Sequence, residues 1–186
     1  GIQVQNIGAN AINMAVVAYP QGGAAPPQLG GAVTVDAERA LNFWMPGFNL
    51  PPVSSAMVIS ATGPTGAIVR GDWSAVGGAA IYGTAEPKTS VLVPLVLKDY
   101  AGQTSQITVQ NSNLYSSISD VSLTFYERGN PTPQLTLTNE TIVRGTSRSW
   151  DLAGLSPGFV GSVVIESATP LAVQSYIQIA GTPGIT

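Results

Sequence analysis

Two carboxylates, Asp36 and Glu38, stand two residues apart in a segment that we expect to be a strand, so both would point to one face. Such a pair could act as a general acid and base or contribute to a calcium site. No third cluster of oxygen ligands accompanies them, and the basic residue Arg39 is adjacent. The pattern favours a solvated charged face, so we predict no catalytic residue, no cofactor and no metal site.

Two lysines, Lys88 and Lys98, are candidates for covalent chemistry. A lysine amine can condense with an asparagine amide into an isopeptide bond, with loss of ammonia and a nearby carboxylate to move the proton. A solvated lysine is the more common role, because its long stem lets the charge reach water. We therefore expect ordinary solvated lysines here.

Five aromatic residues could stack against sugar rings, since aromatic faces pack well on apolar surfaces. Trp44 and Trp150 recur at matching places in the chain, so we predict that they pack in a core or at an interface. Trp73, Tyr82 and Tyr100 remain, and of these Trp73 and Tyr82 are the better candidates for outward contacts with a glycan or a protein.

One sequence signal concerns modification. Asn139-Glu140-Thr141 is an N-glycosylation sequon with an allowed middle residue, so Asn139 is the glycosylation candidate. Single sequons also arise by chance, and the producing organism must have the glycosylation machinery.

The composition excludes most familiar catalytic and metal-binding machinery. The 186 residues include no His and no Cys, which removes histidine-based triads, thiol nucleophiles, disulfides and the usual zinc, haem and iron–sulfur ligands. Seven basic residues and a pI near 4.7 do not provide the basic surface that nucleic acid requires, so we expect no nucleic-acid partner. We predict that the protein is not an enzyme.

The charge content points to assembly. Only 9% of the residues are charged, against about 25% in typical soluble domains. A positive mean hydropathy of +0.24 suggests that neighbours or glycan cover much of the surface. No apolar run reaches the roughly 18 residues of a membrane span. The chain begins at Gly1 instead of Met, which we interpret as a processed, trimmed or partial product.

The chain contains one unit twice, because matching segments recur at offsets that drift only from 105 to 107 residues. The matched pairs are Ile-Gln-Val-Gln-Asn at 2–6 with Ile-Thr-Val-Gln-Asn at 107–111, Pro-Gln-Leu at 27–29 and 133–135, Trp44 with Trp150, and 55–58 with 162–165.

Within each unit, apolar residues alternate in short runs that are separated by Gly, Pro, Asn and Ser, which is typical of half-buried strands. We expect an all-β protein with two tandem immunoglobulin-like β-sandwich domains. Pro94 predicts that its strand lies at a sheet edge. The predicted strands are 2–6, 12–19, 32–37, 40–45, 55–61 and 66–71 in the first unit, and 90–98, 106–111, 120–127, 134–143, 147–152, 160–167 and 171–179 in the second.

The predicted domains are a first sandwich at 1–71, a connector at 72–89 and a second sandwich at 90–186. The first unit lacks a counterpart of the strand at 90–98, because Gly1 already stands where that strand should have ended. A sandwich without an edge strand exposes unpaired backbone groups beside an apolar seam.

Four motifs together resemble tandem immunoglobulin-like repeats of bacterial secreted surface and filament proteins. They are the strand ending in Val-Gln-Asn, the Ala18-Tyr19 and Phe125-Tyr126 pairs, Gly-Phe-Val-Gly-Ser-Val-Val at 158–164 and Val-Pro-Leu-Val-Leu-Lys at 93–98. The first unit departs from the resemblance at Pro51-Pro52 and in its opening strand. The resemblance implies extracellular display or assembly and no active site.

We therefore expect a non-enzymatic structural subunit of an extracellular filament or cell-surface array. Its expected partners are copies of itself, with glycan as a further candidate. The alternative is an adhesive or carbohydrate-binding fragment of a larger exported protein. A neighbouring copy would complete the first unit along 1–6 and its neighbours by strand addition. The first-choice donor is 178–186, and the second is the connector that leads into 91–98. The predicted subunit-contact residues are Gly1, Ile2, Val4, Trp73, Tyr82, Ile179 and Ile185.

Overall fold

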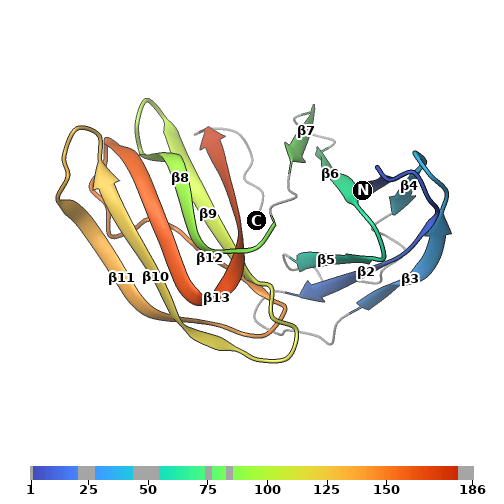
Figure 1. Cartoon of the computed structure of the whole chain (residues 1–186). Coiled ribbons are helices and arrows are strands. Elements are labelled where there is room, and N and C mark those ends of the chain that lie inside the picture. Colours follow the sequence, from blue (N-terminus) through green and yellow to red (C-terminus); the bar gives the residue numbers. More distant parts are fainter. Residues whose placement is uncertain (1, 21–27, 44–54, 74–76, 83–85, 180–186) are drawn as a thin grey trace. The chain divides into compact units, whose positions relative to one another are not determined.

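The computed structural model describes residues 2–20, 28–43, 55–73, 77–82 and 86–179 (Figure 1). Every regular element in these residues is a β-strand, so the protein is all-β as predicted. By its internal contacts the chain divides into two compact units, Gly1–Ala85 and Glu86–Thr186. The described residues include no helix that is long and apolar enough to span a membrane.

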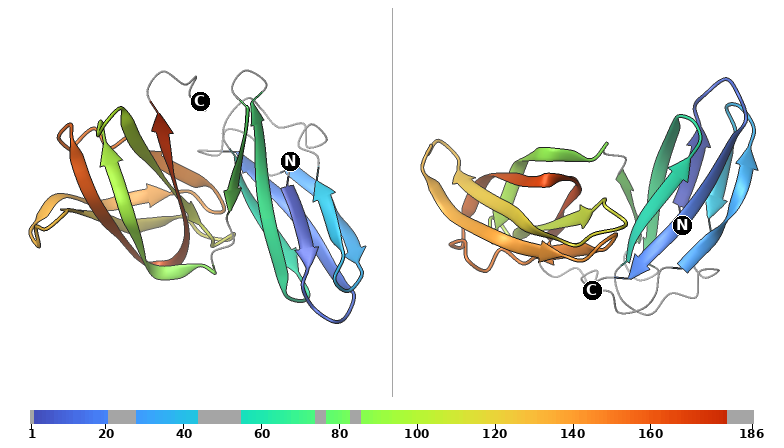
Figure 2. Two further views of the ribbon diagram at one scale, coloured as in Figure 1. Left: turned by 90° about the horizontal axis from the view of Figure 1, so that it is seen from above. Right: turned by 60° about the horizontal axis from the view of Figure 1, so that its bottom comes forward.

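The second unit is built around one long strand that bends back on itself. β13 pairs with β8 and β10 over its first part and with β9 over its second part (Figures 1 and 2). One layer is therefore β11-β10-β13-β8, and the other is β12-β9-β13. The strands are β8 (Lys88–Lys98), β9 (Gln103–Asn111), β10 (Ile118–Glu127), β11 (Pro133–Ile142), β12 (Ser147–Trp150) and β13 (Phe159–Ile179).

The two layers bury a shared core because apolar side chains alternate along each strand. In β9, Ile107 and Val109 are fully buried, and the intervening residues are partly exposed. β10 contributes Leu123 and Phe125 in the same way, and Trp150 closes the core from β12. Of the two predicted placements of Trp150, core or interface, the structure shows the core.

The described residues of the first unit form two separate sheets, ordered β4-β1-β6-β7 and β3-β2-β5. Its core includes Ile2 and Val4 from β1 and Met14 and Val16 from β2. The strands are β1 (Ile2–Asn6), β2 (Ile12–Pro20), β3 (Gln28–Val35), β4 (Ala40–Phe43), β5 (Ser55–Ala61), β6 (Thr65–Trp73) and β7 (Gly77–Tyr82).

The same pairing scheme recurs in both units. β1 pairs with β4 and β6, as β9 pairs with β12 and the second part of β13. β2 pairs with β3 and β5, as β10 pairs with β11 and the first part of β13. The repeated sequence thus encodes a repeated strand arrangement.

The strand pairing shows that two of the matches drawn from the sequence are displaced by one residue. Ile2 lies opposite Phe43, and its counterpart Ile107 lies opposite Trp150. Phe43 therefore corresponds to Trp150, whereas Trp44 lies outside the described residues. Similarly, Val16 lies opposite Ile59 and Leu123 opposite Ile165, so β5 matches β13 at an offset of 106 instead of 107.

Two local expectations are corrected. Asp36 and Glu38 lie in the turn after β3 instead of on a strand, and Glu38 has a left-handed backbone with φ of 58°. The segment predicted as a connector, 72–89, contains the end of β6, all of β7 and the start of β8. β7 is rich in small residues that have low strand propensity, and its antiparallel pairing with β6 stabilises it as a strand.

Pro94 was predicted to mark an edge strand, and this is confirmed for the described residues, because β8 pairs with β13 alone. A register shift places Pro94 and Leu95 opposite the step from Gly161 to Val163. A strand that needs no hydrogen-bond donor on its outer side tolerates proline there.

Candidate functional site

The second edge of β5 is a position where the two units differ. In the second unit, the corresponding part of β13 is paired on one side with β10 and on the other with β8. In the first unit, β5 is paired with β2, and no other described strand lies along its second edge. The backbone groups on that edge therefore form no ladder within the described chain.

The side chains next to this edge are incompletely covered. Val163 and Ile165 of β13 are both 0% exposed, because β8 places Val93 and Val91 opposite them. Their counterparts on β5, Met57 and Ile59, pack against the first unit's core but remain partly exposed. An apolar seam thus borders the open backbone edge.

β5 also lacks the features that usually protect an edge strand. Natural edges carry charged residues, prolines or bulges that discourage pairing with another chain. The sequence of β5, Ser-Ala-Met-Val-Ile-Ser-Ala, has no charge and no proline, and its pairing with β2 is continuous from Ser55 to Ala61. The edge is chemically suited to accept another strand.

The structure corrects the predicted location of this edge. Ile2 and Val4 are 2% and 0% exposed and belong to the core, so they are not available as subunit contacts. β1 is paired on both sides, with β4 and β6, because it is a central strand. Among the described residues, the open position borders β5 instead of β1. Gly1 itself lies outside the described residues.

The other predicted contact residues are placed only in part. Trp73 and Tyr82 belong to the β6–β7 hairpin, where Trp73 lies opposite Gly77, and their side chains lie outside what the structure describes. Ile179 ends β13 and lies opposite Gln103, so its backbone is already engaged with β9. Ile185 lies outside the described residues.

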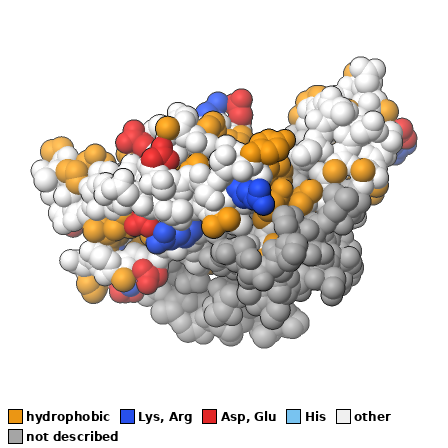
Figure 3. Space-filling model, turned by 90° about the horizontal axis from the view of Figure 1, so that it is seen from below, with side chains coloured by type: hydrophobic (Ala, Val, Ile, Leu, Met, Phe, Trp, Pro, Cys, Tyr) orange, Lys and Arg blue, Asp and Glu red, His pale blue; other side chains and the backbone are white. Residues whose placement is uncertain are grey.

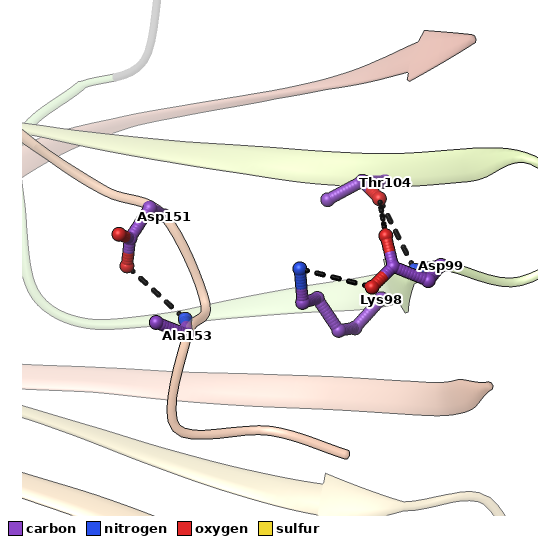
Figure 4. Close-up of polar contacts among 5 residues, drawn as sticks. All are labelled: Lys98, Asp99, Thr104, Asp151 and Ala153. Carbon is purple, nitrogen blue, oxygen red and sulfur yellow. Dashed lines mark hydrogen bonds and ion pairs between the residues drawn. The ribbon is translucent and has the colours of Figure 1, made fainter. Parts of the chain in front are cut away.

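The charged residues form local pairs. Lys98 Nζ lies 3.1 Å from a carboxylate oxygen of Asp99, and Thr104 donates its hydroxyl to the other oxygen at 2.9 Å (Figure 4). Lys98 and then Thr104 lower the pKa of Asp99 by stabilising its charged form. Lys88 pairs with Glu86 at the surface. Both lysines thus contact carboxylates, and neither has a described contact with an asparagine.

The carboxylates do not converge on a metal site. Asp36 and Glu38 are exposed, and the described residues contain no cluster of three acidic side chains suited to a cation. Asp151 instead caps its own turn by accepting the backbone N–H of Ala153 at 3.1 Å (Figure 4).

Asn139, the glycosylation candidate, is exposed on β11. It has a φ of 58° and lies at a register shift, where Val121 and Leu123 of β10 face Glu140 and Leu137. The β-bulge turns this residue away from regular pairing. Its side chain is therefore accessible, and its modification stays a prediction.

The outer face of β9, β12 and the second part of β13 is neutral and polar. Thr108 and Ser149 share a hydrogen bond of 2.8 Å across β9 and β12, and Tyr176 donates its hydroxyl to Gln106. Gln174 lies opposite Thr108 on β13. On the face drawn in Figure 3, the described atoms are mostly uncharged, and the charged side chains form small separate spots.

A groove of about 820 Å³ lies on the other layer of the second unit, beside the bulge at Pro94. Its lining includes Leu95, Tyr126 and Val160, together with one acidic and one basic residue, Glu127 and Arg128. An active site normally gathers several polar groups with defined mutual geometry. The described lining is therefore better suited to apolar contact than to catalysis.

No protein-family model, no curated protein and no solved structure matches this chain.

Proposed function

We propose that the chain forms two immunoglobulin-like sandwiches in tandem and is a non-enzymatic extracellular structural subunit. It assembles with copies of itself into a filament or surface array by strand addition at β5. The observation that supports this most directly is that Met57 and Ile59 are partly exposed. Their counterparts Val163 and Ile165, which lie beside the paired strand β8, are fully buried.

Strand addition would satisfy the backbone and the side chains of β5 at the same time. The incoming strand gains main-chain hydrogen bonds, and its alternate side chains cover the apolar seam. When one segment of a subunit fills a different site on the next subunit, the contact is heterologous and propagates unless its rotation closes a ring. Because few residues are charged, electrostatic repulsion between copies opposes this packing only weakly.

The donor in this proposal is the segment 180–186, which follows the part of β13 that is paired with β9. β8 is the second possible donor. Its exchange would uncover the first part of β13 in its own unit, so an exchanged β8 would gain little net burial. In the tail, Pro183 and Ile185 stand two residues apart, so they would be the two apolar side chains that face the seam.

Two altered chains test the assembly. In the first, residues 180–186 are deleted. In the second, a copy of residues 88–102, which comprise β8 and its turn, is fused ahead of Gly1 so that it can fill the β5 edge within the same chain. We expect filaments of native protein in negative-stain electron microscopy and monomers of both altered chains in sedimentation velocity. Normal filaments from the fused chain would refute strand addition at β5, and normal filaments from the deletion alone would exclude the tail as donor.

A second candidate, carbohydrate binding, is favoured by one observation. The outer face that carries Gln106, Thr108, Ser149, Gln174 and Tyr176 combines amides, hydroxyls and one aromatic ring without charge. Sugars are bound by such neutral donors and acceptors together with aromatic packing. Affinity electrophoresis in soluble polysaccharides, with Tyr176→Ala as the variant, tests this function. Unretarded migration of the native chain in every polysaccharide would reject it.

A further inference from the structure

The second unit contains a complete example of the strand that the β5 edge lacks. β8 runs antiparallel to β13, with Val91 opposite Ile165, Leu92 opposite Val164 and Val93 opposite Val163. Val93 is buried and Val91 is partly buried, while Leu92, on the other face, is 61% exposed. Two valines separated by one residue therefore cover the two core positions.

The first unit presents the same two positions in the same register. Tyr19 lies opposite Ala56, as Tyr126 lies opposite Ser162, which makes Met57 and Ile59 the counterparts of Val163 and Ile165. The residue between them, Val58, corresponds to the outward-facing Val164. An incoming strand would therefore need aliphatic side chains two residues apart to face Ile59 and Met57.

We infer that the β5 edge is a binding site for an extended peptide segment of the β8 type, which enters antiparallel with branched aliphatic residues at alternate positions. The β8-like residue order Ser-Val-Leu-Val would place its serine beside Ser60 and its second valine beside Met57. This inference rests on the proposed function only for the identity of the molecule that supplies the segment in an assembly.

Selectivity follows from the chemistry of the edge. Main-chain hydrogen bonds are common to every sequence and supply affinity, whereas the side chains that cover the seam supply discrimination. β5 has no charged residue that could pair with an incoming charge, so a charged side chain facing Met57 or Ile59 would lose hydration without compensation. The site should therefore select aliphatic residues at the two inward positions and tolerate change at the outward one.

The probe is a synthetic peptide with the sequence of residues 89–99, added to the full chain. Two matched peptides carry Val91→Ser plus Val93→Ser at the inward positions, or Leu92→Ser at the outward position. We expect the native and Leu92→Ser peptides to bind with similar affinity, and the doubly substituted peptide to bind about tenfold or more weakly. Equal affinity of all three peptides, or no binding by the native peptide, would overturn the inference.

Hydrogen exchange locates the bound peptide. We expect new protection of alternate β5 amides within 55–61, namely those whose N–H groups point away from β2. We expect none along the first part of β13, because β8 already occupies that edge. Protection confined to the second unit would overturn the inference. A nitroxide at the peptide N-terminus should broaden the amide signals of Ser60 and Ala61 more than those of Ser55 and Ala56, and the reverse would refute the antiparallel entry.

Matched protein variants separate the edge from a general loss of stability. Met57→Lys should abolish peptide binding, whereas Val58→Lys, on the outward face of the same strand, should retain it. If Met57→Lys also lowers the melting temperature, its loss of peptide binding is not used as evidence. Peptide binding by the native chain and by the Val58→Lys chain then decides the outcome. Peptide binding in a protein that forms no filaments would refute the proposed assembly but leave this inference intact.

Discussion

Asn6 and Asn111 occupy equivalent positions in the two units, and both side chains are completely buried. Asn6 accepts the backbone N–H of Gly8 at 2.9 Å and donates to the carbonyl of Val35 at 3.1 Å. Asn111 accepts from Asn113 at 2.9 Å and donates to the carbonyl of Ile142 at 3.2 Å. Each asparagine thus joins the end of one strand to the end of a strand in the facing layer.

Replacing either asparagine should strongly destabilise its unit. Asn6→Ala and Asn111→Ala each remove the acceptor of a partly buried N–H and the donor to a buried carbonyl, and we expect a loss of about 2–4 kcal/mol in the free energy of unfolding. Urea denaturation measures the loss. Gln5→Ala, at an exposed position next to Asn6, is the control and should change stability by less than about 0.5 kcal/mol. Equal effects at positions 5 and 6 would contradict the assigned role.

Phe43 and Trp150 should be the corresponding aromatic core residues. Phe43→Ala and Trp150→Ala should each destabilise the protein by about 3–5 kcal/mol, because both side chains are more than nine-tenths buried. Trp150→Phe should cost less, since the indole N–H has no hydrogen-bond partner among the described residues. Guanidinium denaturation gives these values. A Trp150→Phe variant as unstable as Trp150→Ala would show that the indole N–H matters after all.

Asp120 should make stability depend on pH. It accepts the backbone N–H of Ala168 at 2.7 Å and the hydroxyl of Ser167 at 2.9 Å, at the bend of β13. These bonds favour the carboxylate and lower its pKa in the folded protein. The stabilisation is therefore fully present above the unfolded pKa of about 3.9 and is lost as the pH falls through the folded pKa.

The measurement compares the free energy of unfolding of the native chain and Asp120→Asn between about pH 2 and pH 7. We expect the native advantage to be greatest near neutral pH and to shrink below about pH 4. Ser167→Ala, which removes one of the two donors, should show a smaller pH dependence than the native chain. A difference that stays constant down to pH 2 would rule out this carboxylate as the titrating group.

Gly161→Ala should disrupt the contact between β13 and β10. A Cβ at this position would lie 2.0 Å from the backbone carbonyl of Tyr126 and 2.6 Å from the ring of Phe159. We expect a loss of about 3 kcal/mol or more, because backbone must move. Gly154→Ala is the control, since its Cβ would meet only the flexible side chain of Leu135. Differential scanning calorimetry should rank Gly161→Ala well below Gly154→Ala in melting temperature.

Ile59 and Ile165 should respond differently to truncation. Ile165→Ala removes a fully buried side chain and should cost about 2–5 kcal/mol, whereas Ile59→Ala in the free subunit should cost less. If a neighbouring copy covers Ile59, its cost should rise with protein concentration, because assembly stabilises the folded state by mass action. Thermal melts over a hundredfold concentration range test this. A concentration-independent cost would argue against coverage by another copy.

The sequence by itself determined the all-β class, most strand positions and the duplication. These depend on local patterns, because an alternating apolar run can bury only one face of a strand wherever the chain leads it. Pro94 identified an edge strand for an equally local reason, since proline has no N–H to donate. The buried asparagines were visible as the repeated Val-Gln-Asn, although their hydrogen bonds were not.

The tertiary structure decided register and neighbourhood, which no single segment contains. A one-residue shift exchanges the two faces of a strand, so only the pairing with β1 could show that Phe43, not Trp44, matches Trp150. Gly145 has a φ of 68° in the turn that matches Glu38, and this glycine was the available signal that residues 36–39 form a turn. The sequence predicted an open edge in the first unit, but its place beside β5 depends on which described strands hydrogen bond to each other. That is set by contacts between residues far apart in the chain.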